Sequence, residues 1–287
     1  MTTTPHLAPS TVDPNEPGIP PEALISYVYA VSRVGSAAEE AIASLAGLGG
    51  RSPHTVCAAG LAAVVSSVPE ATFGTEGLTA QLEDLERLEV IARTHDAVVE
   101  AASRRTAVLP MRLATVYLDD SRVASMLEAR SEELHGLLSW LEGHVELGVK
   151  VYADPSSAAS EQPGAEKPGS ALQGPGQAYL RRRQAQRRGR QDAYRAAAAA
   201  ASRIAEHLTR LASSRVSHRP QQGELASGAG ENIANDAYLV PVRSEAEFRA
   251  AVAQANGEVP GVRIELTGPW APYSFVGAVT TEYQGRT

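Results

Sequence analysis

The side chains best suited to chemistry in this sequence are few and scattered. His95 and Asp96 are adjacent, but neighbouring residues on a helix point about 100° apart, and no other metal-ligand type lies close to them. We therefore interpret His95 as a histidine that packs inside the fold. Cys57 is the only cysteine and has no basic neighbour that would lower its pKa, so we expect a buried, inert thiol.

Sequence motifs of known catalytic sites are absent. The sequence contains no G-x-S-x-G elbow, no H-E-x-x-H, no Walker lysine loop and no G-x-G-x-x-G fingerprint. The glycines at 47, 49 and 50, and those at 228 and 230, lack the spacing of a nucleotide-binding loop. We therefore expect no enzyme activity, no cofactor and no metal site.

Charge is strongly segregated along the chain. Residues 1–152 carry 10 basic and 20 acidic side chains, whereas residues 177–219 carry 11 arginines and only two acidic residues. The densest cluster comprises Arg181, Arg182, Arg183, Arg187 and Arg188. These arginines are consistent with a solvated helix that pairs with the acidic half, or with a binding patch for a partner protein or, less favoured, for nucleic acid. Only two tyrosines lie among them, which argues against stacking on single-stranded nucleic acid.

Three charged residues interrupt segments that otherwise resemble strands. Arg112 follows Pro110, and Glu146 and Lys150 lie in HVELGVKVY. Because side chains alternate along a strand, Glu146 and Lys150 should point to the same face of a sheet. That face is either an ordinary solvated surface or a polar interaction surface.

Residues 23–152 are predicted to form an N-terminal α+β domain. Strands are expected at Ile25–Val31, around the turn at Gly60, in a proline-broken form over 107–117, and at 144–152. Leucines spaced by three or four residues predict one helix from Leu78 to Val99 and a second over 123–141. We expect a ferredoxin-like variant, with a mixed or antiparallel sheet and two helices on one face.

Residues 177–277 are predicted to form a C-terminal α+β domain. A proline- and glycine-rich stretch, 153–176, is the expected linker, and 1–22 and 278–287 are expected tails. The C-terminal domain should contain a long helix over 177–215, a strand ending at Ser244, a short helix with a capping box at Ser244–Glu247, and a strand from Val262.

The composition indicates a soluble, cytoplasmic protein. The hydrophobic share is 43%, and no unbroken apolar run approaches the length of a membrane span. The N-terminal residues also lack the basic and apolar blocks of a secretory signal.

An aromatic turn follows the last predicted strand. It contains Gly268, Pro269, Trp270, Pro272 and Tyr273. The prolines lack an N–H group, so we expect this segment to leave the sheet ladder. The rings could cover the C-terminal core as a lid, which we favour, or stand exposed as an anchor for a partner.

Four blocks of the sequence resemble the gas-vesicle F/L family. They are YVYAV, AVLPMR, VELGVKVY and LTGPWAPYSFVG, in the order and approximate spacing of that family. The resemblance extends from about Ser26 to Gly277 and is most specific in LTGPWAPYSFVG.

The resemblance implies a non-enzymatic, two-domain α+β protein of the gas vesicle. Proteins of this family are needed for vesicle assembly and are thought to contact the shell protein and other gas-vesicle accessory proteins. The expected mechanism is adapter binding during vesicle nucleation. The competing interpretation is a nucleic-acid-binding or regulatory module built on the arginine-rich helix.

Overall fold

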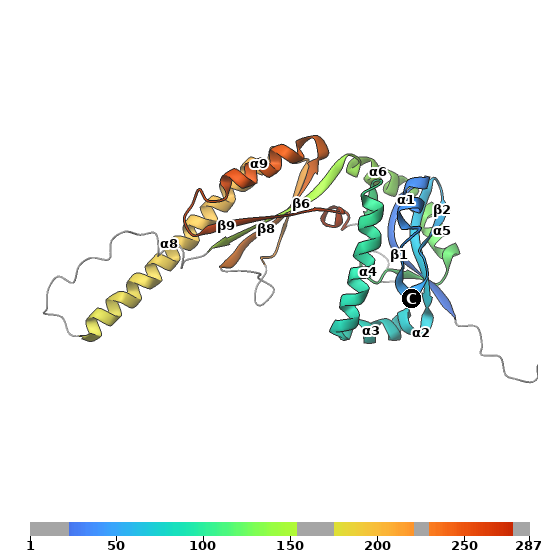
Figure 1. Cartoon of the computed structure of the whole chain (residues 1–287), viewed down its shortest axis with the longest axis horizontal. Coiled ribbons are helices and arrows are strands. Elements are labelled where there is room, and N and C mark those ends of the chain that lie inside the picture. The colour runs from blue at the N-terminus through green and yellow to red at the C-terminus, as the bar shows by residue number, and fades with distance from the viewer. Residues whose placement is uncertain (1–22, 154–174, 221–229, 278–287) are drawn as a thin grey trace, which may run out of the picture.

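The computed structural model describes residues 23–153, 175–220 and 230–277 and shows two antiparallel β-sheets with helices packed on them (Figure 1). This confirms the predicted α+β class. Among the described strands, none is shared between the two sheets. Figure 1 shows the sheets side by side along the long axis of the molecule, joined where α6 leads into β6.

The first sheet has the strand order β2-β3-β1-β4, with β5 also paired to β1, and every pairing is antiparallel. Together with a helix after β1 and a helix before β4, this order is the ferredoxin-like arrangement expected from the sequence. The strands are β1 (Leu24–Arg33), β2 (His54–Ala58), β3 (Leu61–Pro69), β4 (Val108–Pro110) and β5 (Val116–Tyr117).

Helices cover both faces of the first sheet, so the prediction that they share one face was wrong. Side chains of α1 and α4 pack with Tyr27, Tyr29 and Val64 on one face. Those of α5 and α6 pack with Val28 and Leu61 on the other. The helices are α1 (Ser36–Ile42), α2 (Glu70–Phe73), α3 (Thr75–Glu83), α4 (Leu85–Ser103), α5 (Asp120–Ala129) and α6 (Ser131–Leu141), with a 3-10 turn at Leu48–Gly50.

Both predicted helices of this half are broken in two. The Asp84 side chain accepts hydrogen bonds from the backbone N–H groups of Glu86 and Arg87, so a new helix begins after it. The second helix breaks at Arg130, which separates α5 from α6. Asp119 caps α5, as the sequence suggested, by accepting from the N–H of Arg122.

The second sheet has the order β7-β8-β6-β9. Its central strand β6 is the segment expected to close the first sheet, and that expectation was wrong because β6 pairs with β8 and β9 along its length. The elements are β6 (His144–Ala153), α8 (Pro175–Thr209), β7 (Ser214–His218), β8 (Glu231–Pro241), a 3-10 turn (Val242–Ser244), α9 (Glu245–Ala255), β9 (Val262–Trp270) and a final 3-10 turn (Tyr273–Phe275).

Helices α8 and α9 lie on one face of the second sheet. Leu208 of α8 and Phe248 and Val252 of α9 pack against Leu147 and Tyr238 of the sheet. The expected capping box is not formed, since the Ser244 side chain makes no cap hydrogen bond. Most of the predicted linker lies outside the described residues, so the division into domains at 153–176 stays a prediction.

Candidate functional site at the junction of the two sheets

Residues 271–277, here called the C-terminal strap, leave the second sheet and pack on the first. Ala271 and Tyr273 join the apolar cluster on the α1/α4 face, and Phe275 and Val276 join the cluster on the α5/α6 face. The Phe275 ring also meets the Trp140 ring edge-on, with 6.0 Å between centroids. The strap therefore contributes apolar side chains to both cores of the first sheet.

Glu146 of β6 fixes the turn of the strap. Its carboxylate accepts hydrogen bonds from the Ser274 backbone N–H at 2.9 Å and from the Ser274 hydroxyl at 2.7 Å. His218 of β7 lies 2.9 Å from the same hydroxyl. Burial raises the pKa of Glu146, and the two hydrogen bonds from Ser274 oppose that rise. Glu146 was predicted to lie on a polar sheet face. It is buried there, and its carboxylate links the second sheet to the strap through two hydrogen bonds.

His95 of α4 lies in an aromatic cage that the strap completes. Its ring is close to those of Tyr27, Tyr29 and Tyr273, with centroids 5.7, 5.6 and 6.3 Å away. Its Nδ1 lies 2.9 Å from the Tyr27 hydroxyl and its Nε2 lies 3.2 Å from the Met111 carbonyl. A carbonyl only accepts, so Nε2 carries the proton and Nδ1 accepts from Tyr27.

The cage keeps His95 neutral. Burial lowers the pKa of His95 to about 4, although the hydrogen bond to Met111 acts in the opposite direction. The interpretation of His95 as a packing histidine therefore agrees with its place in the core, where it is 3% exposed. Tyr273, a predicted site residue, contacts this cage rather than the C-terminal core.

Trp270 is not a lid. Its side chain is 48% exposed, and its Nε1 donates to the Thr267 hydroxyl at 3.2 Å. The segment also stays in the sheet longer than expected, because a bulge across Gly268 and Pro269 lets Trp270 pair with Glu146. Gly268 suits this bulge, since its φ is +99° and a Cβ atom would lie 2.8 Å from the Glu146 carbonyl oxygen. Pro272 follows at the start of the strap.

Lys150 lies on the same face of the second sheet as Glu146. In the pairing with β8, which has no register shift between these two residues, Glu146 lies opposite Leu239 and Lys150 opposite Asn235, so the strand pairing agrees with the predicted shared face. Farther along this face, the Arg263 guanidinium lies 4.0 Å from the centre of the Tyr152 ring. The part of this face beyond the strap is therefore polar.

Arg112 lies at the far end of the strap. Its guanidinium is 3.5 Å from the Gly277 carbonyl oxygen. The segment just before it, at Met111, receives the His95 hydrogen bond. Arg112 therefore belongs to the junction.

The arginine-rich part of α8 projects away from the first sheet (Figure 1). Arg183, Arg187 and Arg188 are exposed, and the structure does not describe the side chains of Arg181 and Arg182. Within the described residues, the α8 ion pair joins Arg195 to Asp192, and none joins α8 to the acidic first 152 residues. The exposed arginines Arg183, Arg187 and Arg188 are therefore accessible to another molecule.

The remaining candidates for chemistry lie apart in the described part of the chain. Cys57 is exposed on β2, so the expectation that it is buried was wrong. Over the described ranges 23–153, 175–220 and 230–277, His, Cys, Asp and Glu side chains do not gather in groups of three or more that could hold a metal ion. The described helices also include none long and apolar enough to span a membrane.

The four sequence blocks that suggested a family meet at this junction. YVYAV supplies Tyr27 and Tyr29, AVLPMR supplies Met111, and VELGVKVY supplies Glu146. The final block supplies the strap. Sequence reasoning missed Ser274 and His218, because a single serine in a short turn and a single histidine at the end of a strand carry no local pattern.

Comparison with protein families agrees with these blocks. A family model described as "Gas vesicle synthesis protein GvpL/GvpF" matches residues 25–277. The chain belongs to this family. The resemblance identified from the sequence is therefore confirmed.

Relatives and solved structures support the same assignment. The chain is 43% identical over 256 residues to gas vesicle protein L of Streptomyces sp., covering 88% of this chain and 93% of the relative. It is 23% identical to gas vesicle protein F2 of Halobacterium salinarum, covering 81% of this chain and 86% of the relative. Its fold is similar to crystal structures of GvpF from Anabaena sp. and from Microcystis aeruginosa.

The two crystal structures match most of the chain. The Anabaena structure has a TM-score of 0.60 at 18% identity and covers 88% of this chain and 96% of its own. The Microcystis structure has a TM-score of 0.59 at 17% identity and covers 88% and 98%. The GvpL/GvpF family is a gas vesicle family, so this chain takes part in gas vesicle formation. The family is not a known enzyme family.

Proposed function

We propose that the chain is a non-catalytic adapter that binds the gas vesicle shell protein and other gas-vesicle accessory proteins during vesicle nucleation. The observation that supports this most directly is the junction, where the strap joins both cores of the first sheet and is bonded to Glu146 of the second. Such a junction holds two binding surfaces at a fixed distance and angle, which is what an adapter needs.

Two surfaces outside the junction are suited to partners. The first is the polar face of the second sheet with the half-exposed Trp270 at its border, and tryptophan is among the residues enriched at interface hot spots. The second is the exposed arginine-rich part of α8. A projecting helix with this charge is suited to an acidic protein surface, since charge complementarity speeds encounter and selects partners.

A nucleic-acid role is the second candidate, because it is favoured by the same exposed arginines. It predicts tight binding to duplex or single strands that weakens steeply with salt. Aromatic support is poor in the described part of the helix, because the tyrosine side chain described there, that of Tyr194, has the Arg190 guanidinium 6.0 Å from its ring centre and its hydroxyl bonded to the Glu231 carboxylate. We therefore favour a protein partner.

Pairwise capture of each gas-vesicle protein by the full-length chain tests the proposal. The variant Arg183→Gln/Arg187→Gln/Arg188→Gln should lose at least one protein partner and keep wild-type stability. A matched control, Arg93→Gln/Arg104→Gln/Arg105→Gln, changes the same number of exposed arginines on or beside α4 and should keep every partner.

Two results would oppose the proposal. One is that the wild-type chain captures no gas-vesicle protein. The other is strongly salt-dependent nucleic-acid binding that the α8 variant abolishes while protein capture is unchanged. Cell fractionation should recover the chain in the cytoplasm with vesicles or their assembly intermediates.

A further inference from the structure

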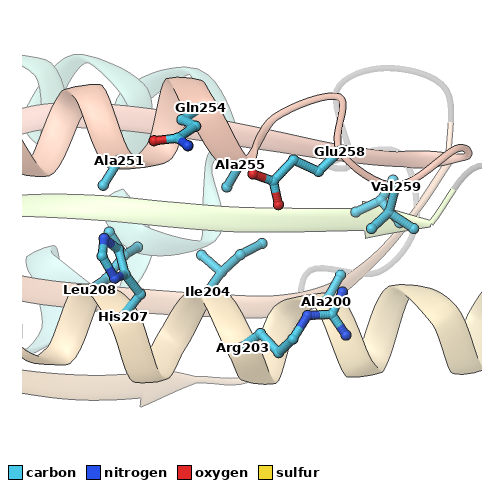
Figure 2. Close-up of a pocket in the computed structure, with 11 residues that line it drawn as sticks. Ala200, Arg203, Ile204, His207, Leu208, Ala251, Gln254, Ala255, Glu258 and Val259 are labelled. Atoms are coloured by element: carbon cyan, nitrogen blue, oxygen red, sulfur yellow. The ribbon is translucent and has the colours of Figure 1, made fainter.

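A groove of about 300 Å³ runs between helices α8 and α9 on the helix-covered face of the second sheet (Figure 2). It is distinct from the junction and from the arginine-rich end of α8. Ile204 of α8 lies opposite Ala251 and Ala255 of α9, and Val259 and Val262 extend the apolar lining. All five side chains are partly exposed, and Ile204, Ala251 and Ala255 pack at the border of a buried cluster.

The groove stays open because small residues line the α9 side. Ala251 and Ala255 are four residues apart, so they occupy successive turns of the same helix face. Two alanines opposite Ile204 leave space that larger side chains would fill. Partly exposed apolar side chains in a concave site are typical of a surface that a partner covers.

The two sides of the groove carry opposite charge. Arg203 lies on the α8 side, and Glu258 lies on the opposite side just after α9 (Figure 2). Both side chains are exposed, and within the described residues neither forms an ion pair. A partner that lies between them can therefore meet a positive group on one flank and a negative group on the other.

The dimensions fit about two turns of helix. The lining residues of α8 run from Ala200 to Leu208, which corresponds to roughly 12 Å of helix axis at 1.5 Å per residue. A third helix can rest on two neighbouring helices by placing apolar residues at positions i, i+3 or i+4, and i+7 into the space between them.

We propose that this groove binds an amphipathic helix of a partner protein, with apolar residues over Ile204, Ala251 and Ala255, a carboxylate toward Arg203 and a basic side chain toward Glu258. This inference rests on the adapter function and specifies the kind of partner segment that one surface takes. It requires no movement of the junction.

The test uses the full-length chain and three synthetic helical peptides of about 14 residues with leucines at i, i+3 and i+7. One peptide carries glutamate on one flank and lysine on the other, the second carries glutamate on both flanks, and the third carries lysine on both. Fluorescence anisotropy should show that the wild type prefers the Glu/Lys peptide. A peptide that reverses its direction in the groove also exchanges its two flanks. The Glu/Lys peptide can therefore always place its glutamates toward Arg203 and its lysines toward Glu258, whichever flank carries them.

Single charge changes should redirect the preference. Arg203→Glu makes both sides acidic and should favour the Lys/Lys peptide, whereas Glu258→Arg should favour the Glu/Glu peptide. Both residues are exposed, so we expect neither change to affect folding. An unchanged order of peptides in both variants would overturn the proposal.

A space-filling change tests the site itself. Ala255→Trp should weaken binding of all three peptides about tenfold or more by occupying the groove. Ala253→Trp places the same side chain at an exposed position of α9 outside the groove lining and is the matched control. Wild-type affinity of the Ala255→Trp variant, with thermal melting confirming that it is folded, would show that the peptides bind elsewhere.

Capture of individual gas-vesicle proteins separates this inference from the adapter function. If Ala255→Trp and Arg203→Glu retain every partner of the wild type, the groove inference fails and the adapter function stands. If the wild type captures nothing, the adapter function fails, and the peptide titrations still decide the groove. Conversion of a wild-type dimer to a monomer by Ala255→Trp would identify the occupant as a second copy and overturn the proposed partner.

Discussion

The two sheets differ in how they are covered. The first sheet has helices on both faces, and its central strand β1 is almost entirely buried. The second has α8 and α9 on one face only, and on the other face Ala237 and Leu239 pack in the cluster that contains Phe275 of the strap. The first sheet therefore builds most of its core locally, whereas the second covers its remaining apolar residues by docking.

This difference suggests a division of roles. Where the second sheet meets the strap, polar side chains find their hydrogen-bond partners within the chain, as the Glu146 carboxylate does with Ser274. Side chains farther from the junction lie at the surface, as in the α8/α9 groove and on the arginine-rich part of α8. We expect substitutions at the junction to reduce the free energy of unfolding and those at the distal surfaces to reduce binding.

Phe275→Ala should have the largest effect on stability. The ring is 9% exposed and packs in a cluster with side chains from both sheets. Removing a buried phenylalanine costs roughly 3–5 kcal/mol. Chemical denaturation should show a loss of this size, together with earlier proteolysis near Gly143 where the sheets are joined. Wild-type stability of the variant would mean that the strap does not hold the sheets together.

Glu146→Ala tests the polar part of the junction. It leaves the Ser274 N–H and hydroxyl without their carboxylate, and an unsatisfied buried donor costs roughly 1–3 kcal/mol. Lys150→Ala is the control on the same face of the same strand and should change stability by less than about 1 kcal/mol. Equal losses in urea denaturation would contradict the distinction between the docked and open parts of this face.

His95→Gln tests the aromatic cage through pH. The folded-state pKa of about 4 lies below the unfolded value of about 6.5, so the unfolded chain binds more protons between these values. The stabilisation is complete above pH 6.5 and is lost as pH falls toward 4, by about 2 kcal/mol between pH 7 and pH 5. Glutamine is neutral and retains a donor and an acceptor, so this part of the pH dependence should disappear.

Glu146 changes the pH dependence of stability in the opposite direction to His95. Burial raises the pKa of Glu146, so the folded state holds a proton more tightly and gains stability as pH falls. Comparing the wild type with His95→Gln at each pH cancels that contribution, since both chains contain Glu146. Parallel stability curves for the two proteins between pH 7 and pH 5 would show that His95 is not held neutral by the cage.

The sequence predicted local features well and long-range pairing less well. The hairpin turn around Gly60 was predicted correctly, and Ala59 and Gly60 both have the positive φ of a two-residue turn. Strand β6 was recognised as a strand but assigned to the wrong sheet, because alternation identifies a strand and not its neighbours. The docking of the strap could not be predicted for the same reason, since Ser274 bonds to Glu146 across 128 residues and contacts His218 across 56.

Trp270→Ala should have the smallest effect on stability, and it separates two aromatics that lie only five residues apart. The Trp270 ring is 48% exposed, whereas Phe275 is 9% exposed, so removing the tryptophan should cost less than about 1 kcal/mol. Its hydrogen bond to Thr267 lies at the surface and contributes little to that value. If the open face of the second sheet binds a partner, Trp270→Ala should nevertheless weaken capture of that partner about tenfold or more, as expected of an interface anchor. Melting temperature and capture of gas-vesicle proteins by the same purified variant check both values. A loss of several kcal/mol would place Trp270 with the junction, and unchanged stability with unchanged capture would leave this end of the face without a binding role.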